Sequence, residues 1–175
     1  MKKALVIIDM QNDFITGVLG NDECRAVVPK VVKRVQEAVN DKMDIIFSQD
    51  THQENYLSTQ EGKKLPVPHC MKNTDGWKII PELAEVAEQK GVIFTKETFG
   101  SRAMAEYIME HNYDEVELVG VCTDICVISN AITIKSFAPE LEVFVNESCC
   151  AGVSMQSHQT AIEAMKACQI NVKEL

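Results

Sequence analysis

The sequence predicts a three-layer, doubly wound α/β domain around a central six-stranded, mainly parallel sheet. Short apolar runs rich in β-branched residues alternate with segments in which apolar residues have helical spacing. Near-continuous apolar runs are typical of parallel strands that are covered on both faces. Strand–helix alternation indicates βαβ units with right-handed crossovers, as in Rossmann-like domains. The expected strands are residues 4–8, 45–47, 92–94, 116–120, 141–145 and 170–172.

The expected helices lie between these strands and carry recognisable end signals. Ser101 has the side chain of an N-cap residue, and Gly91 follows the last residues of an acidic amphipathic pattern. We expect helices over residues 24–40, 80–89, 101–110, 123–137 and 154–167.

Length and composition favour one globular domain over residues 1–175. The chain is 46% hydrophobic and 25% charged, which excludes a disordered or fibrous chain. Its formal charge of −9 repels phosphate backbones and anionic lipid, so we expect neither a nucleic acid nor a membrane as partner. No apolar run approaches the roughly 20 residues of a membrane span.

The cysteines and the N-terminal segment predict a cytoplasmic protein. Seven cysteines are an odd number, and their scattered positions do not form a disulfide framework. Met1, Lys2 and Lys3 precede an apolar run that is too short for a signal peptide and ends at Asp9. We therefore expect most cysteines to be reduced and buried.

Polar residues follow four of the expected strands. Because the carboxyl ends of parallel strands meet at one edge of a sheet, these side chains are expected to face one crevice. They are Asp9, Asp50, His52, Lys96, Cys122 and Cys126.

The turn at residues 120–127 (GVCTDICV) is the strongest candidate for a nucleophile. A cysteine in the first turn of a helix has its thiolate favoured by the helix dipole, and the N–H groups there bind negative charge. A nearby carboxylate and a lysine would complete an activated nucleophile. Spacing alone does not distinguish Cys122 from Cys126, and two buried structural thiols are the alternative.

Three segments together resemble the signature segments of the isochorismatase-like cysteine hydrolases. They are residues 8–14 (IDMQNDF), 95–101 (TKETFGS) and 120–127, in the order of the family and across the whole chain. The resemblance implies a catalytic triad of Asp9, Lys96 and Cys126, and thus makes Cys126 the nucleophile.

The same resemblance implies the backbone geometry around the nucleophile and part of the substrate pocket. It places a cis peptide between Val121 and Cys122, and an oxyanion hole at the backbone N–H groups of Cys122 and Cys126. Phe14, Val121 and Cys122 are the expected substrate contacts.

A second set of residues resembles the metal site of the nicotinamidase/pyrazinamidase branch of this family. In that branch an Asp, a His two residues later and a further His bind one divalent metal, which implies Asp50, His52 and His69 here. Glu61 is the expected fourth ligand, with Glu54 and Cys70 as competitors. Imidazole and carboxylate suit zinc, manganese or Fe(II), and we expect zinc.

One departure from that branch concerns the substrate. Nicotinamidases carry a Trp shortly before the second metal histidine, whereas residues 65–69 (LPVPH) contain no aromatic side chain. Trp77 is expected to pack beneath the metal loop instead.

The segment from 50 to 75 shows no convincing helix or strand, and a long loop in a compact domain favours function. His111 and His158 are expected to have no chemical role.

The resemblance implies an amidohydrolase that cleaves a small linear amide through a thioester on Cys126. Nicotinamide, giving nicotinate and ammonia, is the first expectation, and another small amide or ureide is the alternative. Vinyl-ether hydrolysis does not need the cysteine, and a non-catalytic metal-binding protein would not be expected to retain all three triad residues. Relatives are often dimers or tetramers, so a homo-oligomer is expected.

Overall fold

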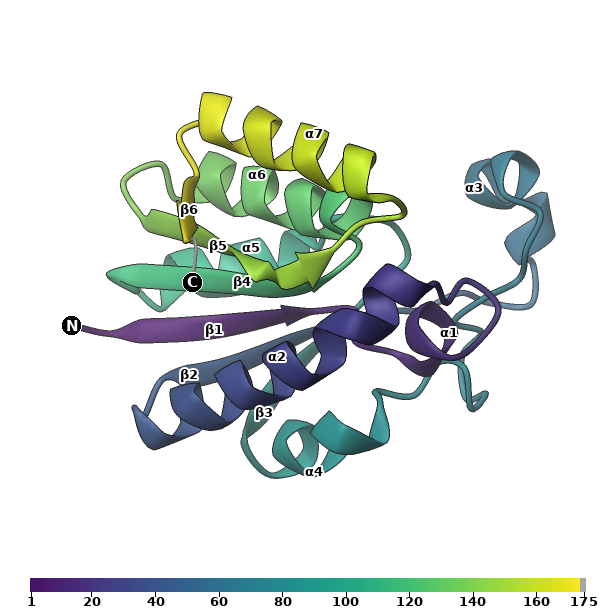
Figure 1. Ribbon diagram of the computed structural model, residues 1–175, viewed down its shortest axis with the longest axis horizontal. Coiled ribbons are helices and arrows are strands. Elements are labelled where there is room, and N and C mark those ends of the chain that lie inside the picture. The colour runs from purple at the N-terminus through teal and green to yellow at the C-terminus, as the bar shows by residue number, and fades with distance from the viewer. Residues whose placement is uncertain (174–175) are drawn as a thin grey trace.

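A computed structural model describes residues 1–173 and contains one six-stranded sheet (Figure 1). Each pairing between its strands is parallel, which confirms the predicted fold class. The strands are β1 (Lys3–Ile8), β2 (Asp44–Asp50), β3 (Gly91–Lys96), β4 (Glu115–Val121), β5 (Glu142–Ala151) and β6 (Asn171–Lys173). Their order in the sheet is β3-β2-β1-β4-β5-β6.

Helices cover both faces of the sheet and form the outer two layers (Figure 1). One face carries α2 (Asp22–Asn40) and α4 (Pro81–Lys90), and the other carries α5 (Arg102–Glu110), α6 (Ile128–Phe137) and α7 (Met155–Ala167). Successive residues of β1 point to opposite faces, so Ala4, Val6 and Ile8 join one core, and Leu5 and Ile7 the other. This two-sided burial explains the unbroken apolar run of β1.

The edge strand β3 departs from the expectation that each apolar run is covered on both faces. Val92 and Ile93 are 38% and 42% exposed. The reason is its position, because β3 pairs only with β2 within the described sheet.

Three helical predictions need correction. The segment from 50 to 75 contains the 3-10 helix η1 (Tyr56–Ser58) and the short helix α3 (Gln60–Lys64), and α1 (Asn12–Ile15) follows β1. The predicted helix over 123–137 begins as a π-helical turn, η2 (Thr123–Val127), before α6. These elements are too short for a 3.6-residue period to be visible, and α3 is fixed by the Thr59 hydroxyl, which accepts from the Gly62 N–H.

The other helices agree with their predictions at the level of one or two residues. Ser101 is the N-cap of α5 and accepts from the Met104 N–H. Within residues 1–173, no helix combines the length and the apolar character that crossing a bilayer requires.

A buried carboxylate on β4 links this strand to α2, β5 and β6. Glu117, 1% exposed, accepts hydrogen bonds from Arg34 (2.8 and 3.0 Å), Lys173 (2.9 Å) and Asn146 (3.0 Å). Burial by itself raises the pKa of Glu117, but Arg34, Lys173 and Asn146 outweigh it and lower this pKa to about 2. The ionised carboxylate therefore stabilises the fold.

Glu117→Gln is expected to lower the free energy of unfolding by about 3 kcal/mol at pH 7. A depressed carboxyl pKa stabilises the fold above the unfolded pKa of 4.5, and this contribution disappears as the pH falls toward about 2. Urea unfolding at several pH values measures the difference from wild type, with the exposed Glu88→Gln on α4 as control. If wild type and Glu117→Gln differ in their free energy of unfolding by the same amount at pH 7 and at pH 3, this account of Glu117 is contradicted.

Candidate active site

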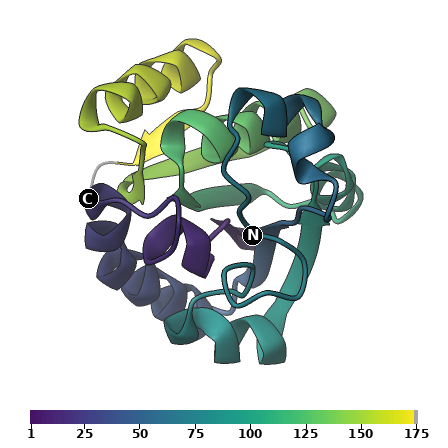
Figure 2. The ribbon, with the colours of Figure 1, turned by 90° about the vertical axis from the view of Figure 1, so that its right-hand side faces the viewer.

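The sheet order places the predicted site at a topological switch point. The strand order reverses between β1 and β4, and ligands of doubly wound sheets bind outside the carboxyl ends at such a point. Figure 2 looks onto this edge, where α1 and the segment containing α3 lie. Asp9 follows β1 and η2 follows β4, while Asp50 and Lys96 end β2 and β3.

Lys96 lies at the centre of these residues, and its side chain is 2% exposed. Its Nζ is 2.7 Å from Asp9 Oδ2, 3.2 Å from Asp50 Oδ1 and 3.6 Å from Cys126 Sγ. The structure therefore brings together the three residues of the expected triad, together with one expected metal ligand.

The Asp9 carboxylate is fixed from a second side by β2. Ser48 Oγ donates to Asp9 Oδ1 at 2.6 Å, and the Asp9 backbone has a left-handed φ of 48°. A non-glycine residue in this region is uncommon, and such residues cluster at functional sites. The turn directs the carboxylate back across the end of the sheet toward Lys96.

Burial and pairing set the protonation of this cluster. Burial raises the pKa of Asp9, and Lys96 opposes this. For Lys96 burial acts to lower the pKa, but the Asp9, Cys126 and Asp50 groups outweigh it and raise the pKa well above the ordinary value. Burial and the Asp9 carboxylate raise the pKa of the Cys126 thiol. The Lys96 ammonium group thus lies between the Asp9 and Asp50 carboxyl groups, next to the Cys126 thiol.

The chain reaches Cys126 through an unusual turn. Gly120 has φ 118°, and a Cβ there would lie 2.2 Å from the Ile8 carbonyl oxygen, so only glycine allows β4 to pass β1 this closely. The Val121–Cys122 peptide is cis, as the family resemblance implies. The Cys122 carbonyl then accepts from the N–H groups of Ile125 and Val127, which closes the turn over Cys126.

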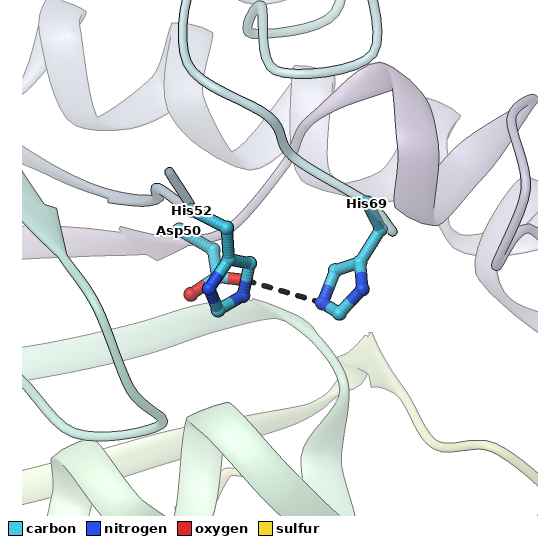
Figure 3. A group of neighbouring side chains, drawn as sticks. All are labelled: Asp50, His52 and His69. Carbon is cyan, nitrogen blue, oxygen red and sulfur yellow. Dashed lines mark ion pairs between the residues drawn. The ribbon is translucent and has the colours of Figure 1, made fainter. Parts of the chain in front are cut away.

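Asp50, His52 and His69 form a compact, buried group that fits a metal ion (Figure 3). One ligand atom from each lies within 4.8 Å of the others. His52 Nε2 is 3.0 Å from Asp50 Oδ2, and His69 Nε2 is 3.5 Å from the same atom. His52 Nε2 is nevertheless buried without a hydrogen bond. An unpaired imidazole nitrogen beside a carboxylate and a second imidazole has the chemistry of a divalent-metal site.

Glu61 is next to this group, and its competitors are not placed equally well. Glu61 Oε1 is 3.6 Å from His52 Nε2 and 3.7 Å from His69 Nε2. Burial raises the pKa of Glu61, which is opposed by His52. Glu54 is exposed, and the compact group of possible ligand atoms does not include Cys70.

Gln11 and Asp13 position the metal residues, and the sequence analysis assigned them no role. Gln11 Nε2 donates to the Asp50 carbonyl at 2.8 Å, and Gln11 Oε1 accepts from the Asp50 N–H at 2.7 Å. Asp13 Oδ2 accepts from the Cys70 N–H at 2.7 Å, directly after His69. Both lie in the same motif as Asp9, but their partners are backbone groups about 40 and 57 residues away, which spacing does not reveal.

Aromatic side chains pack against both histidines. Tyr56 is fully buried, with its ring centroid 4.6 Å from that of His52 and 5.2 Å from that of His69. The Phe14 ring meets His69 edge-on at 5.7 Å. Trp77 packs against the core, and its Nε1 donates to Thr51 Oγ1 at 2.8 Å.

A cavity of about 570 Å³ opens beside the metal group. His52, Tyr56 and Glu61 line one part of it, and Phe99 and Ile125 line another. Cys126, the neighbour of Ile125, is 6% exposed. A small ligand in this cavity would therefore contact His52 and Glu61 of the metal residues, and at Ile125 it would lie next to the nucleophile turn.

Comparison with known proteins agrees with this fold. The Isochorismatase domain family matches residues 3–174, so the chain belongs to the isochorismatase family. The nicotinamidase of Saccharomyces cerevisiae is 25% identical over 213 residues, covering 97% of this chain and 98% of that protein.

Solved structures of the same fold cover the chain almost completely. A nicotinamidase/pyrazinamidase from Bacillus subtilis has a TM-score of 0.88 at 24% identity, covering 99% of this chain and 100% of that chain. The pyrazinamidase of Pyrococcus horikoshii, solved in complex with zinc, has a TM-score of 0.84 at 24% identity and covers both chains fully.

His69→Ala is expected to abolish stoichiometric binding of a divalent metal, because it removes one of three buried ligand atoms. Elemental analysis of protein purified after metal loading measures the metal content. His111→Ala is the matched control, since His111 caps α5 and bonds the Tyr107 carbonyl. Equal metal content in wild type and His69→Ala would show that the ion binds elsewhere.

Proposed function

We propose that this member of the isochorismatase family is a cysteine amidohydrolase of the nicotinamidase type, converting nicotinamide and water to nicotinate and ammonia. The observation that carries the proposal is the contact of Lys96 with Asp9, Cys126 and Asp50. That contact joins an activated nucleophile to a metal-binding group within one crevice.

The proposed reaction begins with proton transfer from the Cys126 thiol to Asp9. The thiolate sulfur attacks the amide carbonyl, and the backbone N–H groups of Cys122 and Cys126 stabilise the oxyanion. Asp9 returns the proton to the leaving nitrogen as the C–N bond breaks, releasing ammonia and leaving a thioester. Asp9 then takes a proton from water as the water oxygen attacks the thioester carbonyl. When the C–S bond breaks, the carboxylic acid leaves and Asp9 returns the proton to the Cys126 sulfur, which restores the thiol.

Lys96 stabilises the negative charges on Asp9 and on the Cys126 sulfur during this reaction. Its ammonium group, 2.7 Å from Asp9, stabilises the ionised carboxylate that the first proton transfer requires. At 3.6 Å from Cys126 Sγ, it also stabilises the thiolate as it forms. The raised pKa of the resting thiol fits a nucleophile that loses its proton only when Asp9 accepts it.

Asp50, His52 and His69 are the proposed ligands of one divalent ion, zinc in the first place, with Glu61 as the fourth ligand. A bound ion would offer the substrate's ring nitrogen an electrophilic contact, directly or through water. The donor set supports zinc, and so does the zinc complex of the Pyrococcus relative. Phe14 and the segment at Val121 and Cys122 are the proposed substrate contacts.

A second candidate substrate class is another small amide or ureide. The observation in its favour is Leu65, which is 38% exposed and lines the cavity in a segment without an aromatic residue. Substrates without a flat ring do not need an aromatic stacking partner. We also propose a reducing cytoplasmic location, which the seven free cysteines favour, and a homo-oligomer, dimer or tetramer.

Cys126→Ala is expected to lower ammonia release from nicotinamide by at least about 10⁴-fold, because it removes the group that forms the thioester. A coupled ammonia assay on metal-loaded protein measures this loss. Cys168→Ala is the control, because Cys168 is exposed at the end of α7. Full activity in Cys126→Ala would contradict the proposed mechanism. Activity of wild type on other small amides alone would favour the second substrate class.

A further inference from the structure

We propose that Thr123 and His158 are positioning residues that fix the oxyanion hole from the side of the nucleophile turn that faces α7. This inference rests on the proposed function, since it assigns the two residues to the same nucleophile turn. From the sequence, His158 is expected to have no chemical role. The structure instead places it against η2, on the side of the turn that faces α7.

The central contact is one short hydrogen bond. Thr123 Oγ1 and His158 Nδ1 are 2.7 Å apart, and they join the first residue of η2 to the first turn of α7. Thr123 is fully buried and directly follows Cys122, whose N–H is a proposed oxyanion donor. Movement of the Thr123 side chain is therefore passed to the adjacent peptide.

Glu147 lies next to the other ring nitrogen of His158. Its Oε1 is 3.8 Å from His158 Nε2, on the far side of the ring from Thr123. The Thr123 hydroxyl and the imidazole nitrogen can form this hydrogen bond with either group as donor, because a hydroxyl and a histidine nitrogen each donate or accept.

A second contact fixes the next residue of the turn. Asp124 Oδ1 accepts from the Val153 N–H at 3.1 Å. A Cβ at Gly152 would lie 2.9 Å from Asp124 Oδ1 and 3.0 Å from His158 Cβ, so the loop before α7 packs closely against both. On the side that faces α7, the turn is thus fixed at two consecutive residues, Thr123 and Asp124.

Different groups fix the part of the turn that carries Cys126. Lys96 contacts Cys126 Sγ, and Asn130 Nδ2 donates to the Cys126 carbonyl at 2.8 Å. Oxyanion stabilisation requires donors about 2.7–3.1 Å from the oxygen of the transition state, so small displacements of the Cys122 peptide weaken it. Because the oxyanion forms only during reaction, the loss should fall on kcat rather than on KM.

The test compares Thr123→Val, which keeps the shape but removes the hydroxyl, with Thr123→Ser, which keeps the hydroxyl. Thr123→Val is expected to lower kcat for nicotinamide about tenfold or more with KM and metal content unchanged, and Thr123→Ser to retain activity within about threefold. Thr160→Val is the matched control, because Thr160 is exposed on α7 and its hydroxyl donates to the Gln156 carbonyl of the same helix.

His158→Leu completes a double-mutant cycle. If the two residues act through one hydrogen bond, Thr123→Val combined with His158→Leu loses no more kcat than either single variant. Losses that multiply, or a Thr123→Ser variant as slow as Thr123→Val, would overturn the inference.

Addition of ¹³C-labelled acetaldehyde to Cys126 separates this inference from the choice of substrate. The sulfur adds to the carbonyl carbon, the thiol proton moves to the carbonyl oxygen, and the new oxygen occupies the oxyanion hole. The adduct, detected by NMR, is expected to be about tenfold weaker in Thr123→Val than in wild type or Thr123→Ser. Wild type that forms the adduct but does not hydrolyse nicotinamide would refute the nicotinamidase proposal alone. An adduct that is equal or absent in all three proteins would overturn the inference.

Discussion

The buried ammonium group of Lys96 connects every part of the site. An isolated charge at 2% exposure would be strongly unfavourable, and only pairing with Asp9 and Asp50 makes it tolerable. Asp50 faces Lys96 with Oδ1 and the two histidines with Oδ2. The Asp50 carboxylate therefore contacts both Lys96 of the triad and the two histidines of the metal group, so both parts of the site depend on this one residue.

The fold makes this pairing possible by bringing four strand ends to one edge. Asp9 and the nucleophile turn meet because β1 and β4 are neighbours across the switch point, and Gly120 lets them approach. Asp50 and Lys96 are paired residues in the β2–β3 register. Other side chains near the site fix the backbone and not the reacting atoms. Gln11 bonds the backbone of Asp50, and Thr123, the residue after Cys122, bonds His158.

Much of this arrangement could be predicted from the sequence, because it depends on local patterns. Apolar runs located all six strands, and polar residues at strand ends indicated the edge of the sheet where the site lies. The choice of Cys126 and of the metal ligands came from the resemblance to the family. The supporting contacts could not be predicted in the same way. Gln11 bonds backbone atoms of a distant strand, and His158 meets Thr123 only through the packing of α7 on η2. The exposure of β3 depends on its place in the sheet order, which its own residues do not encode.

Trapping the acyl-enzyme tests the central claim most directly. Metal-loaded protein would be mixed with nicotinamide, quenched in acid within the first turnover, and digested for mass spectrometry. The account predicts a nicotinoyl group on the peptide containing Cys126, formed as ammonia is released. Hydrolysis of nicotinamide with no acyl group on Cys126 under conditions where the thioester is stable, or with the acyl group on another residue, would contradict it.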